Sequence, residues 1–348
     1  MTTASLVAAS KAVVPLIYRH GRRLVMGAAT TAIVWDGDTA MLALGDGSVR
    51  AAEMAGDLGV YAMHRGAILC AVAGVAGGIV TGGDDGQVIT MAVDGTKAAI
   101  GNFGSKWVEQ LVASPASKLI VAGVGKEAIV WMPGAVSPSH RFAFESTVAG
   151  LSLDAKGKRL AAAHYNGASL LYPVSPGSSR NVLQWVGSHI SCTLHPTAEY
   201  LITGTQETGL HGWRLPQGND MTMSGYRAKT RSFSWNRKAK WLATSGDGRV
   251  VIWPFDGRNG PMGRLPLLAG DRGALVTQVA FHPREDVLAV GYGDGAVTMV
   301  RIDDDRQTLV DEPGGGAISA LAWNAAGTLL AYGDVDGRAG LLDLTKRA

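Results

Sequence analysis

Cysteine and histidine are too few and too scattered in this chain to indicate a metal centre. The 348 residues include two cysteines, Cys70 and Cys192, and eight histidines. No two of them stand at a metal-ligand spacing such as His-x-x-x-His or Cys-x-x-Cys. A serine-nucleophile motif, a phosphate-binding loop and a dinucleotide fingerprint are also missing. The sequence therefore predicts no catalytic residue, no cofactor and no metal site.

Long uncharged runs are nearly absent as well. Residues 66–83 form an 18-residue window without charge, the lower limit for a membrane-spanning helix. The window holds six glycines and is better explained as a pair of strands. Residues 1–10 lack the basic start of a secretory signal. Both cysteines lie in apolar runs, where cysteine behaves as a small buried residue, and unpaired thiols fit a reducing compartment. We expect a soluble, cytoplasmic protein without a membrane segment.

The chain contains a repeated turn instead. Eight times a β-prone run leads into a tight turn and then into a second run that closes on one position. Five residues after each turn, this closing position falls on Ala52, Met91, Trp131, Tyr172, Trp213, Trp253, Val300 and Leu342. The successive spacings are 39, 40, 41, 41, 40, 47 and 42 residues. A period near forty indicates one supersecondary unit copied eight times, none of which can bury its apolar faces alone.

Each repeat unit contains signals for four short strands. Five turns carry Asp-Gly and a sixth carries Asn166-Gly167, dipeptides that tolerate the positive φ of a tight hairpin. Upstream lies a shared β-prone run that ends in a turn signal, as at residues 279–283. A more variable segment, such as residues 182–185, adds the fourth strand. Four short strands per forty residues is the content of a propeller blade.

These residues resemble the WD-repeat β-propeller proteins, over about residues 31–344. The run of apolar residues before His-Pro, the Leu-Ala-x-Gly strand, the Asp-Gly turn and the closing Trp stand in the order of that family. The Trp-Asp pair of the family is absent at Trp131, Trp213 and Trp253, and so is its Gly-His pair. The resemblance implies that the Asp–His–Ser–Trp hydrogen-bond tetrad of the family is incomplete in every blade.

The expected fold class is all-β: one closed β-propeller of four-stranded blades that spans residues 1–348. Eight units predict eight blades, and seven blades plus an extra N-terminal hairpin is the alternative, because the family usually has seven. Rings of this family close with an N-terminal strand, and the last unit stops at its third strand near Leu344. Residues 13–18 or 23–26 are the candidates for the missing strand.

Charge is nearly balanced, at +3, apart from a basic segment at residues 227–240. Aromatic residues interleave with its six cations, and the segment contains no acidic residue. This composition suits single-stranded nucleic acid. A strand separates residues 227–231 from residues 237–240, however, and should place the two groups on opposite faces. Nucleic-acid binding is therefore the second alternative function, and nucleic acid is not the expected partner.

Histidine and aspartate can be interpreted from their places in the unit. His195 and His282 precede proline at matching positions, so we expect them to be turn residues. The Asp of each Asp-Gly turn is expected to initiate the turn by accepting backbone hydrogen bonds. His164 is the one histidine that could face the channel mouth. The first alternative function is a small-ligand or enzymatic site there, built from His164, Asp247, Asp294, Asp334 and Asp336.

The resemblance favours a non-enzymatic scaffold that presents the loops of one propeller face to a protein partner. Candidate contact residues near turns and entry loops are Tyr165, His164, Arg227, Lys229, Tyr292, Tyr332 and Asp334. The longest spacing holds an insert at residues 254–275, which is either a specificity loop or a neutral insertion. An Ala- and Gly-rich composition suggests a bacterial protein.

Overall fold

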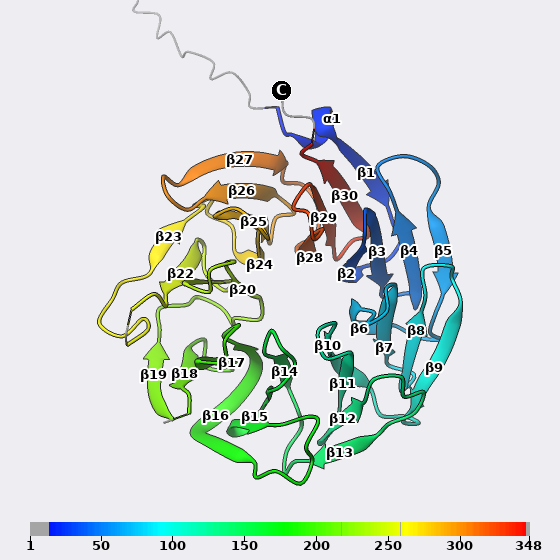
Figure 1. Cartoon of the computed structure of the whole chain (residues 1–348). Helices are drawn as coiled ribbons and strands as arrows, with labels where there is room; N and C mark the ends of the chain where they lie inside the picture. Colours follow the sequence, from blue (N-terminus) through cyan, green and yellow to red (C-terminus); the bar gives the residue numbers. More distant parts are fainter. Residues whose placement is uncertain (1–13, 217, 258, 346–348) are drawn as a thin grey trace, which may run out of the picture.

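The computed structural model describes residues 14–216, 218–257 and 259–345. Within these residues, thirty β-strands and one short helix are arranged in a ring, as Figure 1 shows. The strands form seven hydrogen-bonded sheets, six with four strands and one with six. The first strand of each unit lies toward the centre of the ring, and the later strands lie successively farther out (Figure 1).

The first three units form one four-stranded antiparallel sheet each. Unit one consists of β2 (Thr30–Asp36), β3 (Thr39–Leu44), β4 (Ser48–Ala52) and β5 (Gly59–Ala62). Unit two consists of β6 (Ile68–Ala73), β7 (Ile79–Gly83), β8 (Gln87–Met91) and β9 (Lys97–Asn102). Unit three consists of β10 (Val108–Ser114), β11 (Leu119–Val124), β12 (Glu127–Trp131) and β13 (His140–Ala143).

Units four and five share the six-stranded sheet. Its strands are β14 (Gly150–Leu153), β15 (Leu160–Leu171), β16 (Asn181–Leu194), β17 (Tyr200–Thr205), β18 (Leu210–Arg214) and β19 (Asn219–Met223). β15 turns back on itself at Asn166 and Gly167, where φ is 61° and 137°. Its His164 Nε2 lies 2.9 Å from Ser169 Oγ, whereas five residues of a straight strand would span about 16 Å. β16 is the outer strand of unit four over its first half and the inner strand of unit five over its second half.

The remaining three sheets complete the ring. Unit six consists of β20 (Phe233–Trp235), β21 (Trp241–Thr244), β22 (Val250–Pro254) and β23 (Leu267–Ala269). Unit seven consists of β24 (Val276–Phe281), β25 (Val287–Tyr292), β26 (Val297–Arg301) and β27 (Arg306–Asp311). Unit eight consists of β28 (Ile318–Trp323), β29 (Leu329–Asp334) and β30 (Arg338–Asp343), with β1 (Gly21–Val25) as its fourth strand.

The ring is closed by the N-terminal strand. β1 pairs antiparallel with β30, from Gly21 opposite Leu342 to Val25 opposite Arg338. Of the two candidate segments, residues 23–26 supply most of this strand. Residues 14–18 instead lead into α1 (Ile17–His20), and Val13 lies outside the described residues. Arg23 adds ion pairs to Asp311 and Glu312 at the end of unit seven.

The sheet count corrects the expectation of eight separate four-stranded blades. The propeller has four-stranded blades around most of the ring, but β16 joins units four and five into one sheet, so seven sheets result. Seven blades was the alternative prediction. The first unit, however, is a full four-stranded sheet, β2 to β5, and not the extra N-terminal hairpin of that alternative. This could hardly be predicted, because the turn signal between the two halves of β16 is short, Gly187 followed by Ser188.

The turns confirm the interpretation of aspartate. Asp46 Oδ1 accepts a hydrogen bond from the Ser48 backbone at 2.9 Å, and Asp294 Oδ1 accepts one from Ala296 at 3.1 Å. In the first turn Gly47 has φ 81°, and a Cβ there would lie 2.2 Å from the carbonyl oxygen of Gly66. Glycine is therefore required both for its positive φ and for the close approach of the next loop.

The two histidines that precede proline are turn residues, as expected. His282 Nδ1 accepts the Glu285 backbone N–H at 2.9 Å, while His282 Nε2 lies 2.8 Å from the carbonyl oxygen of Gly327 in the next unit. His195 makes the matching contact with the carbonyl oxygen of Ala239, also at 2.8 Å. Each imidazole fixes its own turn and ties it to the neighbouring blade.

Part of the family's tetrad survives in unit two. His64 Nδ1 lies 2.8 Å from Asp85 Oδ1, and His64 Nε2 lies 2.8 Å from Thr81 Oγ1. The closing position is Met91, so the tryptophan of the tetrad is missing. Unit six keeps the tryptophan instead: Trp253 Nε1 donates to the hydroxyl of Tyr226 at 2.7 Å.

Candidate functional site

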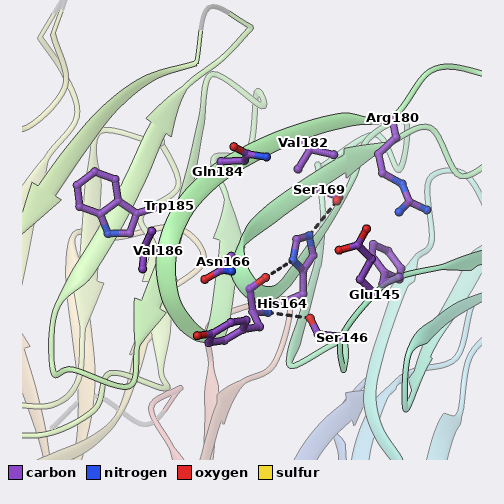
Figure 2. Close-up of a pocket in the computed structure, with 12 residues that line it drawn as sticks. Glu145, Ser146, His164, Asn166, Ser169, Arg180, Val182, Gln184, Trp185 and Val186 are labelled. Carbon is purple, nitrogen blue, oxygen red and sulfur yellow. Dashed lines mark hydrogen bonds between the residues drawn. The ribbon is translucent and has the colours of Figure 1, made fainter.

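A concavity of the ring lies at unit four, beside the long strand β16. It is a surface pocket of about 630 Å³ (Figure 2). The loop after β13, the turn inside β15 and the first half of β16 line it. Its lining includes the side chains of Phe144, His164, Tyr165, Arg180, Val182 and Trp185.

The turn of β15 is held rigidly and sets the geometry of the pocket. His164 Nδ1 lies 3.0 Å from the carbonyl oxygen of Tyr165, which can only accept, so Nδ1 carries a proton. In the neutral ring Nε2 then accepts from the Ser169 hydroxyl at 2.9 Å. The Tyr165 backbone N–H donates to Ser146 Oγ at 3.0 Å, which ties the turn to the entry loop (Figure 2). His164 is therefore occupied in positioning the turn.

One wall of the pocket is formed by a stacked cation. The guanidinium of Arg180 lies 4.5 Å from the ring centre of Phe144 and donates to the carbonyl oxygen of Ala143 at 2.7 Å. The Phe144 ring also packs against His164, at 5.7 Å between ring centres. Stacking and hydrogen bonding together hold the Arg180 side chain in place. The wall is thus preformed.

Apolar side chains surround the mouth of the pocket and point into solvent. Tyr165 is 59% exposed, Trp185 is 41% exposed and Val186 is 85% exposed, and Val182, near the start of β16, is 47% exposed. An outer strand normally shows polar residues to water. Several exposed aromatic and aliphatic side chains around one pocket, with polar residues at its rim, are typical of a binding surface. We call Tyr165, Val182, Trp185 and Val186 the unit-four surface.

Trp185 is also held in place from behind. Its indole stacks on the ring of His211, with ring centres 3.9 Å apart and planes at 16°. Burial lowers the pKa of His211 to about 4, although Asp220, at 3.6 Å, acts in the opposite direction. His211 is therefore neutral at physiological pH and offers Trp185 a flat, uncharged support.

The structure divides the predicted contact residues into two groups. Tyr165, Arg227 and Lys229 are exposed, and His164 is half-buried. Arg227 Nε pairs with Asp247 Oδ1 at 3.0 Å. None of the described contacts tests whether these residues bind a partner, so their role stays a prediction.

Tyr292, Tyr332 and Asp334 lie in the core, which corrects their assignment to the surface. Tyr292 is 0% exposed and donates to the carbonyl oxygen of Gly270 at 2.6 Å. Tyr332 is also buried and donates to Asp311. Asp334 accepts the Arg338 backbone N–H at 2.7 Å, within its own turn. β25 and β29 are buried along nearly their whole length, so these three side chains are not exposed to a partner.

Three of the four carboxylates proposed for a channel-mouth site have partners within the fold, and the fourth, Asp336, is exposed. Asp294 and Asp334 accept backbone hydrogen bonds within their turns, and Asp247 pairs with Arg227. No group of three His, Cys, Asp or Glu side chains in the described part of the chain could hold a metal ion. No helix there is long and apolar enough to cross a membrane.

The basic segment is split as expected. Arg227 lies at the end of unit six that carries the Asp247 turn, as their ion pair shows. Lys240 lies at the other end, where its carbonyl oxygen accepts the Phe255 backbone N–H at 2.7 Å. The two groups of cations therefore do not form one continuous track for a nucleic-acid strand.

Sequence reasoning missed Val182, Trp185, Val186 and Arg180. A signal was present: Trp185 and Val186 are adjacent apolar residues on one strand, and neighbours on a strand point to opposite faces. One of the two must therefore face away from the core of the blade. Only the position of this strand at the outer edge of unit four shows that both are exposed.

Two family models match parts of the chain. The model described as "WD domain, G-beta repeat" matches residues 220–254, and that of the anaphase-promoting complex subunit 4 WD40 domain matches residues 279–348. The chain is 25% identical over 150 residues to WD repeat-containing protein SL1-17 of Schistosoma mansoni, covering 42% of this chain and 48% of that protein. It is 29% identical over 126 residues to the periodic tryptophan protein 2 homolog of Schizosaccharomyces pombe, covering 35% and 14%. The matched region thus spans less than half the length of these relatives.

Solved structures share the fold. The computationally designed Ika8 protein superposes with a TM-score of 0.76 at 15% identity, over 92% of this chain and 97% of that one. A chain of the mitotic checkpoint complex superposes with a TM-score of 0.65 at 15% identity, over 99% and 98%. At such identities the likeness shows the fold alone.

Proposed function

Because this chain belongs to the WD-repeat family, we propose that it is a non-enzymatic scaffold that binds a protein partner through the unit-four surface. The observation that carries the proposal is the set of exposed apolar side chains, Tyr165, Val182, Trp185 and Val186, around a preformed pocket. One matching family model is described as the WD40 domain of anaphase-promoting complex subunit 4, and one solved structure of the same fold is titled as the mitotic checkpoint complex. These names support a protein as the class of partner.

The mechanism of binding is geometric. The backbone of Tyr165 is fixed by the Asn166 turn and by Ser146, and the Trp185 side chain is fixed by its stacking on His211. Association costs free energy for every side chain that must be ordered, about 0.5–1.5 kcal/mol each. A Trp185 side chain that is already fixed, beside a Tyr165 backbone that is already fixed, avoids part of that cost, so a partner meets a surface that needs little rearrangement.

Exposed Trp and Tyr side chains often contribute a large share of the binding free energy at a protein interface. Trp and Tyr are enriched among the few interface residues whose truncation costs about 2 kcal/mol or more. Val182 and Val186 flank them and would exclude water from the contact. Arg180, held on Phe144, supplies a cation at the rim. We expect the partner to bring an apolar side chain for the pocket and an acceptor for Arg180.

The test is affinity purification from the native cell, with wild-type protein and a Tyr165→Ser, Trp185→Ser double variant. The proposal predicts a stoichiometric protein partner that the wild type retains and the double variant loses. Val136→Ser, at an 81% exposed position in the loop between β12 and β13, is the matched control and should retain the partner. Recovery of the wild type alone, or equal retention by the double variant, would contradict the proposal.

The cellular location remains a proposal. We propose the cytoplasm, supported by the two thiols, neither of which forms a disulfide. The relatives named above are eukaryotic, so bacterial origin rests on composition alone. Fractionation of the source cell, followed by detection of the chain, tests the location.

A further inference from the structure

The insert between β22 and β23 leaves apolar side chains in solvent although its base is anchored. Phe255 is buried, and its ring centre lies 5.0 Å from that of Tyr200 in unit five. Gly260 comes against the same tyrosine, where a Cβ would lie 3.2 Å from the ring. Beyond this anchor Met262 is 49% exposed and Leu265 is 89% exposed. Figure 1 shows this loop extending from the outer rim of the ring.

The insert is shaped by its own contacts. Backbone hydrogen bonds join Gly260 to Gly257 at 3.0 Å and Arg264 to Pro261 at 3.1 Å. Asp256 and Arg264 form an ion pair across the loop. The apolar side chains are therefore presented by an ordered loop whose turns hold them away from the core.

Cations gather at the same end of unit six. The turn at residues 236–240 is joined to the insert, because the carbonyl oxygen of Lys240 accepts the Phe255 N–H at 2.7 Å. Arg237, Lys238 and Lys240 are exposed on this turn, and Arg264 adds a fourth cation. Two acids lie against these four cations: Arg264 pairs with Asp256, and Lys238 Nζ lies 3.9 Å from Asp286 Oδ2 of the adjoining unit-seven turn. The surplus of charge is positive.

We call six residues of the two loops the unit-six surface: Arg237, Lys238, Lys240, Met262, Arg264 and Leu265. We propose that the unit-six surface binds a protein segment rich in Asp and Glu that also carries leucine or aromatic side chains. Carboxylates of the segment complement the surplus cations, which steers the encounter. Its apolar side chains cover Met262 and Leu265, removing apolar area from water.

Other classes of partner fit this surface less well. A single-stranded nucleic acid needs a continuous cationic track with stacking platforms, but the remaining cations of the basic segment lie at the opposite end of unit six. A membrane surface calls for an amphipathic helix or a broad apolar face. Here the apolar residues are Met262 and Leu265 on one loop, continued by Leu267 at the edge of the sheet. Because the unit-four surface involves none of these residues, this proposal stands independently of the proposed function.

The test uses the full chain and a fluorescein-labelled 16-residue peptide composed of Asp, Glu, Leu and Phe. Fluorescence anisotropy at low ionic strength should show saturable binding that weakens as salt is added. Leu265→Ser should weaken binding about tenfold, because most of a leucine side chain would no longer be buried. Lys240→Glu should weaken it several-fold through charge reversal. Both residues are exposed, so both variants should melt like the wild type.

Matched controls lie on the same face of other units. Val93→Ser, at a 67% exposed position between β8 and β9, and Lys156→Glu, between β14 and β15, should bind the peptide like the wild type. A peptide with serine in place of Leu and Phe should bind at least tenfold more weakly. Absence of binding, equal affinity for the serine peptide, or tighter binding to phosphatidylserine vesicles or to oligo-dT would overturn the proposal.

Discussion

Ring closure by β1 can be tested with a single core side chain. Leu24 lies on β1, is 7% exposed and packs in a cluster with Leu42 of unit one and Leu341 of unit eight. Leu24→Ala removes a side chain that joins the two ends of the ring, and buried Leu→Ala changes cost about 2–5 kcal/mol. With a loss of about 3 kcal/mol and an m-value of about 3 kcal/mol per molar urea, the unfolding midpoint should fall by about 1 M.

The control for this experiment is the next residue on the same strand. Val25 is 81% exposed, so Val25→Ala should shift the urea midpoint by less than about 0.2 M. Intrinsic fluorescence of the nine tryptophans reports unfolding. A Leu24→Ala shift as small as that of Val25→Ala would refute the role of β1 as the closing strand. Equal destabilisation by the two variants would refute the burial argument.

Three further predictions concern buried groups. The partly buried Cys70 and Cys192 should resist a disulfide reagent at pH 8 until urea is added. The reason is that burial raises the pKa of both thiols, that of Cys192 to about 12. Rapid labelling of the folded protein would contradict this prediction. Because the pKa of His211 falls from 6.5 to about 4 on folding, the unfolded chain binds more protons, so stability should fall by up to about 3 kcal/mol as pH drops from 6.5 to 4. His211→Phe should flatten this fall in urea midpoints measured at pH 7 and pH 4.5, and an unchanged slope would count against the assignment. Trp235→Phe loses the hydrogen bond from the indole to Thr193 Oγ1 at 3.0 Å and should cost about 1 kcal/mol, read from the same unfolding curves.

Much of the fold follows from local turn chemistry that a sequence displays directly. The Asp-Gly and Asn-Gly turns at Asp46, Asp85 and Asn166 fall where they were predicted, because few other residues tolerate the required φ. His195 and His282 were also interpreted correctly from their place before proline. The number of sheets was predicted wrongly, because the strand β16 continues past Gly187 and is shared by two units. This continuity depends on the relative position of the two neighbouring units.

The site was harder to predict, because exposure depends on the position of a strand within its blade. Tyr292 lies beside a turn and so was placed on the surface, yet its strand β25 is covered on both faces. Trp185 lies in the variable segment expected to form a fourth strand, and nothing in that segment indicated that its indole is 41% exposed. The turn pattern gives the order of strands, but not which side chains neighbouring blades leave uncovered.

Binding of the partner by the unit-four surface is the central proposal. The most direct test is the affinity of the purified partner for the wild type and for Trp185→Ser, by titration calorimetry at one salt concentration. The account predicts a loss of at least about 2 kcal/mol, or roughly thirtyfold, with the melting temperature nearly unchanged. An unchanged affinity for Trp185→Ser would place the binding surface elsewhere on the ring and contradict the account.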